Sequence, residues 1–146
     1  MLRNDISNKQ APVIAFNIDE LLFLDKPVEN MKMLEKLKWK VMSDKQKYLS
    51  RPLNKDFISI IDKLWSKYTF SIYFITFRVD LVEELYAILD KYNVNYTSLV
   101  PIYEWEELRR ACELQYMYYF DNNLELLSYI GQHNALTIDK LPSIIK

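Results

Sequence analysis

Short apolar runs alternate with segments of helical periodicity along almost the whole chain. Runs of four to seven mostly apolar residues are typical of buried strands, and five occur, at 13–18, 70–76, 97–100, 116–120 and 135–138. Between them, apolar residues recur at helical spacing in 54–67, 80–92, 104–114 and 124–130. Strands alternating with helices are typical of parallel βαβ units. The sequence therefore predicts an α/β fold, a Rossmann-like three-layer sandwich with a mostly parallel sheet.

A scarcity of glycine narrows the chemistry that such a fold can carry. Gly131 is the only glycine among 146 residues, where average usage would supply about ten. Phosphate loops of the GxxxxGK[ST] type and dinucleotide turns of the GxGxxG type are therefore excluded. We expect Gly131 to end the 124–130 helix, as glycine commonly does, and Asn54 to cap the start of the 54–67 helix.

Cysteine and histidine are equally scarce. The chain has one of each, Cys112 and His133, which excludes disulfide frameworks, zinc ribbons and His-rich metal sites. Cys112 is predicted to be a small core residue and His133 an exposed loop residue. Any catalytic chemistry must then depend on carboxylates, amides and hydroxyls.

The charge and hydropathy of the chain limit the cellular locations and the classes of partner that we expect. Nineteen basic residues balance twenty acidic ones, for a formal charge of −1. The net charge of the chain therefore gives no indication of nucleic-acid binding. Residues 1–10 are polar and no apolar run approaches the ~20 residues of a membrane span. We expect a flexible lead-in at 1–10, one domain over 11–146, a cytoplasmic location and no membrane contact.

The segment between the first strand and the 54–67 helix, about residues 25–53, reads as an insertion. Residues 31–55 carry eight basic side chains against two acidic ones. This composition suits a small cap or flap, or a basic surface for phosphate-bearing ligands. The interpretation we favour is a solvated amphipathic helix with Met31, Leu34 and Leu37 facing inward. Four aromatic residues outside the strands are predicted to rim a pocket or an interface: Trp39, Tyr48, Tyr103 and Trp105.

Three of the predicted strands end in polar residues. Asn17 and Asp19 follow the first strand, Thr76 the second, and Asp121 the 116–120 strand. Ligands of open parallel sheets gather at the carboxyl ends of strands, where the strand order reverses. Carboxylate and amide oxygens suit Mg²⁺, and a hydroxyl suits a phosphate. Each residue alone also fits a turn, a helix cap or a strand end.

The same three segments resemble motifs of the haloacid dehalogenase (HAD)-like superfamily. VIAFNIDELLF at 13–23 is similar to the first motif, hhhhDxDGTLx; SIYFITFR at 71–78 resembles the second, and YMYYFDNN at 116–123 the fourth. The pattern runs from Val13 to about Asp139. It most resembles small, minimally capped phosphatases, such as nucleotidases and the phosphatase part of polynucleotide kinase-phosphatases.

The resemblance implies a role for each matching position. Asn17 stands at the nucleophile position and Asp19 at that of the general acid/base, while Thr76 and Arg78 would bind phosphate. Mg²⁺ would be held by Asn17, the backbone carbonyl of Asp19 and Asp121. The family's phosphate-neutralising lysine has no counterpart between Lys91 and Asp121, so Arg109 or Arg110 would take its place.

Several positions depart from the family pattern. The nucleophilic aspartate is Asn17, and an amide is a far poorer nucleophile than a carboxylate. The glycine and threonine of the first motif are Glu20 and Leu21, and the second acid of the fourth motif is Asn122. Multiple independent losses at one site favour decayed catalysis over a single engineered Asp→Asn change.

We therefore expect a non-hydrolytic, pseudoenzyme-like HAD protein that binds a phosphorylated small molecule, a nucleotide, a nucleic-acid end or a protein. One alternative is a Mg²⁺-dependent phosphomonoesterase or nucleotidase whose aspartate at position 17 is replaced by asparagine, naturally or by design. A second alternative is a pure protein-interaction or inhibitor module that uses the basic insertion.

Overall fold

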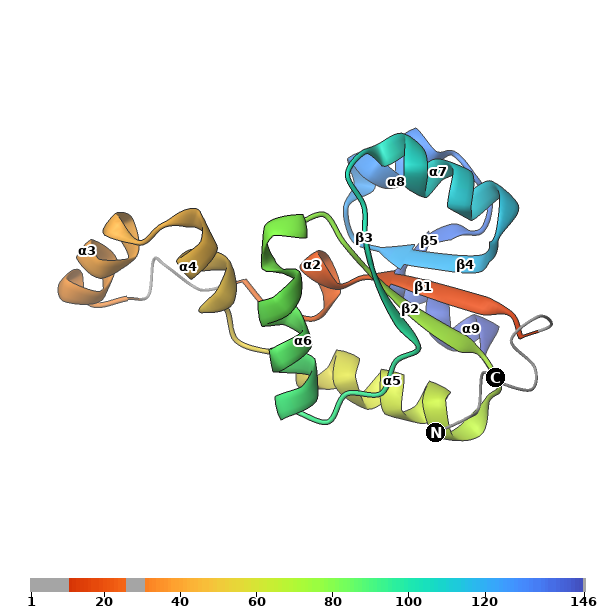
Figure 1. The fold of residues 1–146 in the computed structure, drawn as a ribbon, viewed down its shortest axis with the longest axis horizontal. Helices are drawn as coiled ribbons and strands as arrows, with labels where there is room; N and C mark the ends of the chain where they lie inside the picture. The colour runs from red at the N-terminus through yellow and green to blue at the C-terminus, as the bar shows by residue number, and fades with distance from the viewer. Residues whose placement is uncertain (1–10, 26–30, 146) are drawn as a thin grey trace.

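A computed structural model describes residues 11–25 and 31–145 and contains one five-stranded sheet (Figure 1). Its strands are β1 (Val13–Asn17), β2 (Ser71–Thr76), β3 (Ser98–Pro101), β4 (Tyr116–Asp121) and β5 (Ala135–Thr137). They are hydrogen-bonded in the order β3-β2-β1-β4-β5, and every pairing is parallel. The predicted α/β sandwich is confirmed. The predicted lead-in at 1–10 lies outside the described residues.

Helices connect the strands at the positions that the periodicity indicates. The α-helices are α2 (Ile18–Leu21), α3 (Met33–Val41), α4 (Asp44–Leu49), α5 (Lys55–Lys67), α6 (Val82–Lys91), α7 (Trp105–Leu114), α8 (Leu124–Ile130) and α9 (Leu141–Ile144). Two 3₁₀ turns, η2 (Val79–Leu81) and η3 (Ile138–Lys140), precede α6 and α9. The short helices α2, α4 and α9 were not predicted, because four to six residues are too few to show a helical period.

Both predicted helix ends are confirmed. The Asn54 side chain accepts a hydrogen bond of 3.2 Å from the Phe57 amide at the start of α5. Gly131 follows α8 with φ of 63°, in the left-handed region. A β-carbon is disfavoured in that conformation, so the chain's only glycine ends a helix.

Alternate residues of β1 point into two separate cores. Ile14 and Phe16 contact residues of α5, α6 and α9 on one face of the sheet. Val13 and Ala15 lie against α7 and α8 on the other face, as the layers in Figure 1 show. All four are buried, because a strand with helices on both sides places each side chain in one core or the other.

Two further side chains lie where the sequence indicates. Cys112 is buried in the core beneath α7, and burial raises the pKa of its thiol to about 12, so it is an inert packing residue. His133 is exposed in the loop before β5.

The insertion after β1 contains α3 and α4. One prediction about it was wrong: Leu34 and Leu37 do not face inward but are 65% and 55% exposed, and Met31 is only half-buried. Figure 1 shows the reason, because α3 projects beyond α4 and has no layer of the sandwich beside it. Within the described residues, no helix is long and apolar enough to span a membrane.

Candidate functional site

The strand order places the predicted residues at one edge of the sheet. β1 pairs with β2 on one side and with β4 on the other, and the direction of the order reverses at β1. Asn17 ends β1, Thr76 ends β2 and Asp121 ends β4, while Asp19 lies in α2, directly after β1. The parallel sheet thus brings together four residues that are up to 104 positions apart. We call these four residues the strand-end cluster.

Asp121 is buried and accepts hydrogen bonds on both carboxylate oxygens. The backbone amides of Asn122 and Asn123 donate to Oδ1 at 2.7 and 2.9 Å. The Asn17 amide donates to Oδ2 at 2.9 Å, and the Tyr119 hydroxyl donates to the same oxygen. Burial raises the pKa of Asp121, and the bonds from Tyr119 and Asn17 act in the opposite direction. Four donors therefore satisfy this carboxylate within the protein itself.

Asn17 links Asp121 to the start of α2. Its Nδ2 donates to Asp121, while its Oδ1 accepts a bond of 3.0 Å from the Asp19 amide and so caps α2. Only this orientation of the amide places a donor against the carboxylate and an acceptor against the N–H group. An aspartate here would place a second carboxylate against Asp121, which is unfavourable without a cation between them.

Asp19 is held by three donors. The Tyr48 hydroxyl and the Thr76 hydroxyl donate to Oδ1 at 2.5 and 2.7 Å, and the Phe77 amide donates to Oδ2 at 2.8 Å. Its backbone carbonyl accepts a 3.0 Å bond from Nη1 of Arg51. Asp19 is therefore engaged in contacts that tie the insertion to the sheet.

The three groups proposed to ligate Mg²⁺ do lie together, but their arrangement does not fit the ion. Mg²⁺ needs several oxygen atoms directed toward one point. Here the Asn17 oxygen is directed at an amide, the Asp19 carbonyl at a guanidinium, and both Asp121 oxygens at hydrogen-bond donors. Within residues 11–25 and 31–145, no group of three or more His, Cys, Asp or Glu side chains is placed to hold a metal ion.

Tyr48 of α4 connects the insertion to the strand ends. The Tyr48 hydroxyl bonds Asp19, and its ring contacts two guanidinium groups, whose Cζ atoms lie 4.3 Å (Arg51) and 5.0 Å (Arg78) from the ring centroid. Burial and the Asp19 charge raise the pKa of the Tyr48 hydroxyl well above its usual value, so it remains a donor at neutral pH. Arg51 also lies 4.7 Å from the Phe23 ring.

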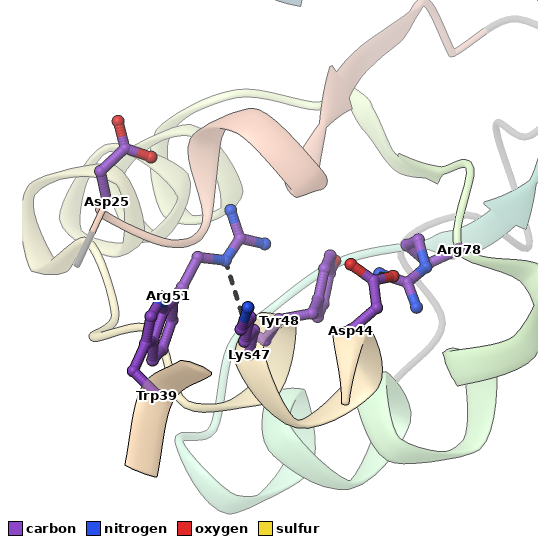
Figure 2. A pocket seen from close by; sticks show the side chains of 7 residues that line it. All are labelled: Asp25, Trp39, Asp44, Lys47, Tyr48, Arg51 and Arg78. Carbon is purple, nitrogen blue, oxygen red and sulfur yellow. Dashed lines mark hydrogen bonds and ion pairs between the residues drawn. The ribbon is translucent and has the colours of Figure 1, made fainter. Parts of the chain in front are cut away.

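Beside this contact lies a cavity of about 360 Å³, shown in Figure 2. We call it the basic pocket; its lining residues are Asp25, Trp39, Asp44, Lys47, Tyr48, Arg51 and Arg78. Three cationic side chains outnumber two carboxylates there. The prediction that Trp39 and Tyr48 rim a pocket is confirmed. Tyr103 is exposed, and Trp105 contacts Tyr129 between α7 and α8.

Arg51, one of the residues that line the basic pocket, carries a hydrogen-bond donor that is unsatisfied within the described residues. Its Nε and Nη1 bond the carbonyls of Tyr48 and Asp19. Its Nη2 is buried and has no hydrogen-bond partner among the described residues. A buried charged donor without an acceptor is costly, so an anion that reached Nη2 would be favoured.

The remaining predicted residues lie apart from the strand-end cluster or at its margin. Arg78 pairs with Asp80 at 3.1 Å and with Asp44 at 3.1 Å, so it borders the basic pocket with part of its charge already compensated. Arg109 pairs with Glu106 at 2.7 Å within α7, and Arg110 is exposed on the same helix. Neither arginine has a contact with Asn17 or Asp121 among the described residues.

Glu20 and Asn122 border a second cavity of about 250 Å³, which Arg51 also lines. Loss of hydration and the nearby Asp121 charge raise the pKa of Glu20. Glu20 therefore lies beside the strand-end cluster, next to Asp19 and close to Asp121.

Two site residues were missed in the sequence. Tyr119 lies two positions before Asp121 in β4, and this spacing places both side chains on the same face of a strand; it is a signal that could have been used. Arg51 lies 32 positions from Asp19, and no local pattern relates the two.

Comparison with known proteins leaves the family unassigned. No family model matches the sequence, and no significant match is found among curated proteins or solved structures.

Proposed function

We propose that this chain is a HAD-like protein without hydrolytic activity that binds a phosphorylated small ligand in the basic pocket. The observation that carries the proposal is the Asn17–Asp121 hydrogen bond of 2.9 Å. An amide N–H there satisfies the carboxylate that a metal ion would otherwise need to neutralise. The neutral amide also lacks the nucleophilicity that an aspartyl-phosphate mechanism requires.

The hydrogen bonds that Asp19 already accepts support the proposed lack of hydrolytic activity. A general acid/base must give and take a proton at a substrate atom within hydrogen-bond reach. The Asp19 oxygens already accept bonds from Tyr48, Thr76 and Phe77. A substrate would have to displace Tyr48, and with it the anchor of α4, before it could reach this carboxylate.

The chemistry of the basic pocket supports an anionic ligand. Guanidinium groups match the oxygens of a phosphate group, and the buried Nη2 of Arg51 lacks an acceptor among the described residues. Trp39 gives the pocket an aromatic wall, which suits a base or another planar group attached to the phosphate. A volume of about 360 Å³ lies in the range of small-molecule sites.

Titration calorimetry with inorganic phosphate and with adenosine monophosphate, without divalent cations, tests the binding. We expect saturable binding that falls by at least about tenfold in Arg51→Met, since a charge-assisted pair is lost. Arg51 also supports the fold, so Lys47→Met provides a second variant with less structural risk. Arg110→Met, on α7, is the matched control and should bind like the parent chain.

A phosphatase assay with p-nitrophenyl phosphate and Mg²⁺ tests the other half of the proposal. We expect no turnover above a blank that lacks protein. Sustained hydrolysis that Asp19→Ala abolished would contradict the proposal and favour the phosphomonoesterase alternative. No binding of either probe, or equal binding by Arg51→Met, Lys47→Met and the parent, would favour the interaction-module alternative.

A further inference from the structure

Helix α3 exposes a continuous apolar stripe. Met33, Leu34, Leu37 and Val41 are 80%, 65%, 55% and 84% exposed. With 100° between successive residues, these four side chains share an arc of about 100° on the helix. We call them the α3 stripe. Scattered exposed apolar residues are ordinary, whereas four large ones on one helix face indicate a binding surface.

The α3 stripe is not the face that attaches α3 to the molecule. Trp39 lies on the opposite side of the helix, lines the basic pocket and has the Lys47 ammonium 5.6 Å from its ring. No residue of α3 is buried. Figure 1 shows α3 at the far end of the molecule from the sheet, beyond α4. Packing within the described residues therefore does not account for the stripe.

Lysines flank the α3 stripe on both sides. Lys36 and Lys40 follow one border and Lys38 the other, and all three are exposed. Pairing two copies through this stripe would bring like charges together along both borders, which is unfavourable. A groove with carboxylates on its rims would instead pair with them.

The spacing of the stripe fits a recognised mode of association. Leu34, Leu37 and Val41 stand at positions i, i+3 and i+7, the anchor spacing of an amphipathic helix that lies in an apolar groove. We propose that the α3 stripe docks into an apolar groove, rimmed by acidic residues, on a partner protein. The two leucines and Val41 are the anchors, and the flanking lysines select the partner and its orientation.

A synthetic helical-hairpin peptide, whose two helices form a leucine-lined groove with a row of glutamates along each rim, is a probe of this chemistry. We expect it to bind the full chain in fluorescence anisotropy, and to bind the double variant Leu34→Gln/Leu37→Gln at least about tenfold more weakly, because the apolar anchors are lost. Both leucines are exposed, so circular dichroism should show an unchanged fold. Leu114→Gln, the same change at an exposed leucine of α7, should bind like the parent.

A second peptide, with glutamine in place of each glutamate, tests the charge selection. We expect its affinity to be at least about tenfold weaker, with less dependence on salt. Equal binding of the two peptides, or no binding of either, would overturn the proposal. So would stripe-dependent binding to phosphatidylserine vesicles without peptide binding, or a stripe-dependent dimer in sedimentation equilibrium, because the occupant would then be a membrane or a second copy.

Discussion

The strand-end cluster lies at the carboxyl edge of the sheet and the α3 stripe lies on the insertion, far from the sheet, and the side chains of the two regions are in opposite situations. In the cluster, Asp19 and Asp121 together accept seven hydrogen bonds from side chains and backbone amides. In the stripe, four large apolar side chains remain exposed. The cluster satisfies its polar groups with hydrogen bonds inside the protein, while the stripe leaves large apolar side chains exposed.

This difference indicates which surfaces of the protein remain open to a ligand or a partner. Asp121 accepts four hydrogen bonds, the full capacity of a carboxylate, and Asp19 accepts three, so few acceptor sites are left for a ligand. The basic pocket connects the two regions, because it is lined by Trp39 of α3 and by Tyr48 and Arg51, which bond Asp19 of the cluster. A ligand in the pocket and a partner on α3 would both contact the insertion. The hydrogen bonds from Tyr48 and Arg51 to Asp19 attach that insertion to the cluster.

Removing the Asp121 carboxylate is expected to have the largest effect. Asp121→Ala leaves four buried or half-buried donors without an acceptor, so we expect a loss of about 3–5 kcal/mol in the free energy of unfolding. Urea denaturation measures it. Asp90→Ala, at an exposed position of α6, is the control and should stay within about 0.5 kcal/mol.

Two leucine truncations compare buried and exposed helices directly. Leu64 of α5 is fully buried, and Leu64→Ala should cost about 2–4 kcal/mol because a cavity remains. Leu34→Ala in the α3 stripe should change the free energy of unfolding by less than about 0.5 kcal/mol. A large loss at Leu34 would show that the stripe already packs within the chain and would remove the basis for a docking surface.

Tyr48→Phe tests the link between the insertion and the cluster. The ring keeps its contacts with Arg51 and Arg78, while the hydroxyl and its 2.5 Å bond to Asp19 are lost. We expect a loss of about 1.5–3 kcal/mol in the free energy of unfolding, typical of a hydrogen bond to a charged group. Hydrogen exchange should show faster opening of α4 amides, with β4 amides unchanged. Uniform loss of protection would mean that α4 is not a separate unit.

The smallest expected effect lies outside both regions. Arg109, and then Tyr129, lower the pKa of Glu106 from 4.5 to about 2. Because the folded-state pKa is depressed, this stabilisation is present above about pH 4.5 and is lost as the pH falls toward about 2. Glu106→Gln should lower stability slightly at pH 6, and parent and variant should converge near pH 2. A difference that persists at pH 2 would contradict this assignment.

The fold could be predicted from the sequence because its signals are local. The apolar runs, the helical periods, Asn54 and Gly131 each specify structure within a few residues. The positions of Asn17, Thr76 and Asp121 followed from the same reasoning, since parallel strands present their ends at one edge.

The hydrogen-bond network that satisfies the carboxylates of the cluster could not be predicted from the sequence. It depends on the direction of the Asn17 amide, and on Tyr48 and Arg51 reaching Asp19 across 29 and 32 positions. The orientation of α3 was mispredicted for a related reason. Its amphipathic pattern shows which side is apolar, but not whether another element of the chain covers that side.

The central claim is that the Asn17 amide, by donating a hydrogen bond to Asp121, stabilises this carboxylate in place of a bound cation. Thermal melting of the parent chain and of Asn17→Asp, each with and without Mg²⁺, tests it most directly. We expect no Mg²⁺ effect on the parent, and in Asn17→Asp a melting temperature several degrees lower, as about 2 kcal/mol of like-charge repulsion would cause, which Mg²⁺ partly restores. Stabilisation of the parent by Mg²⁺, or an Asn17→Asp variant as stable as the parent without the ion, would contradict the claim.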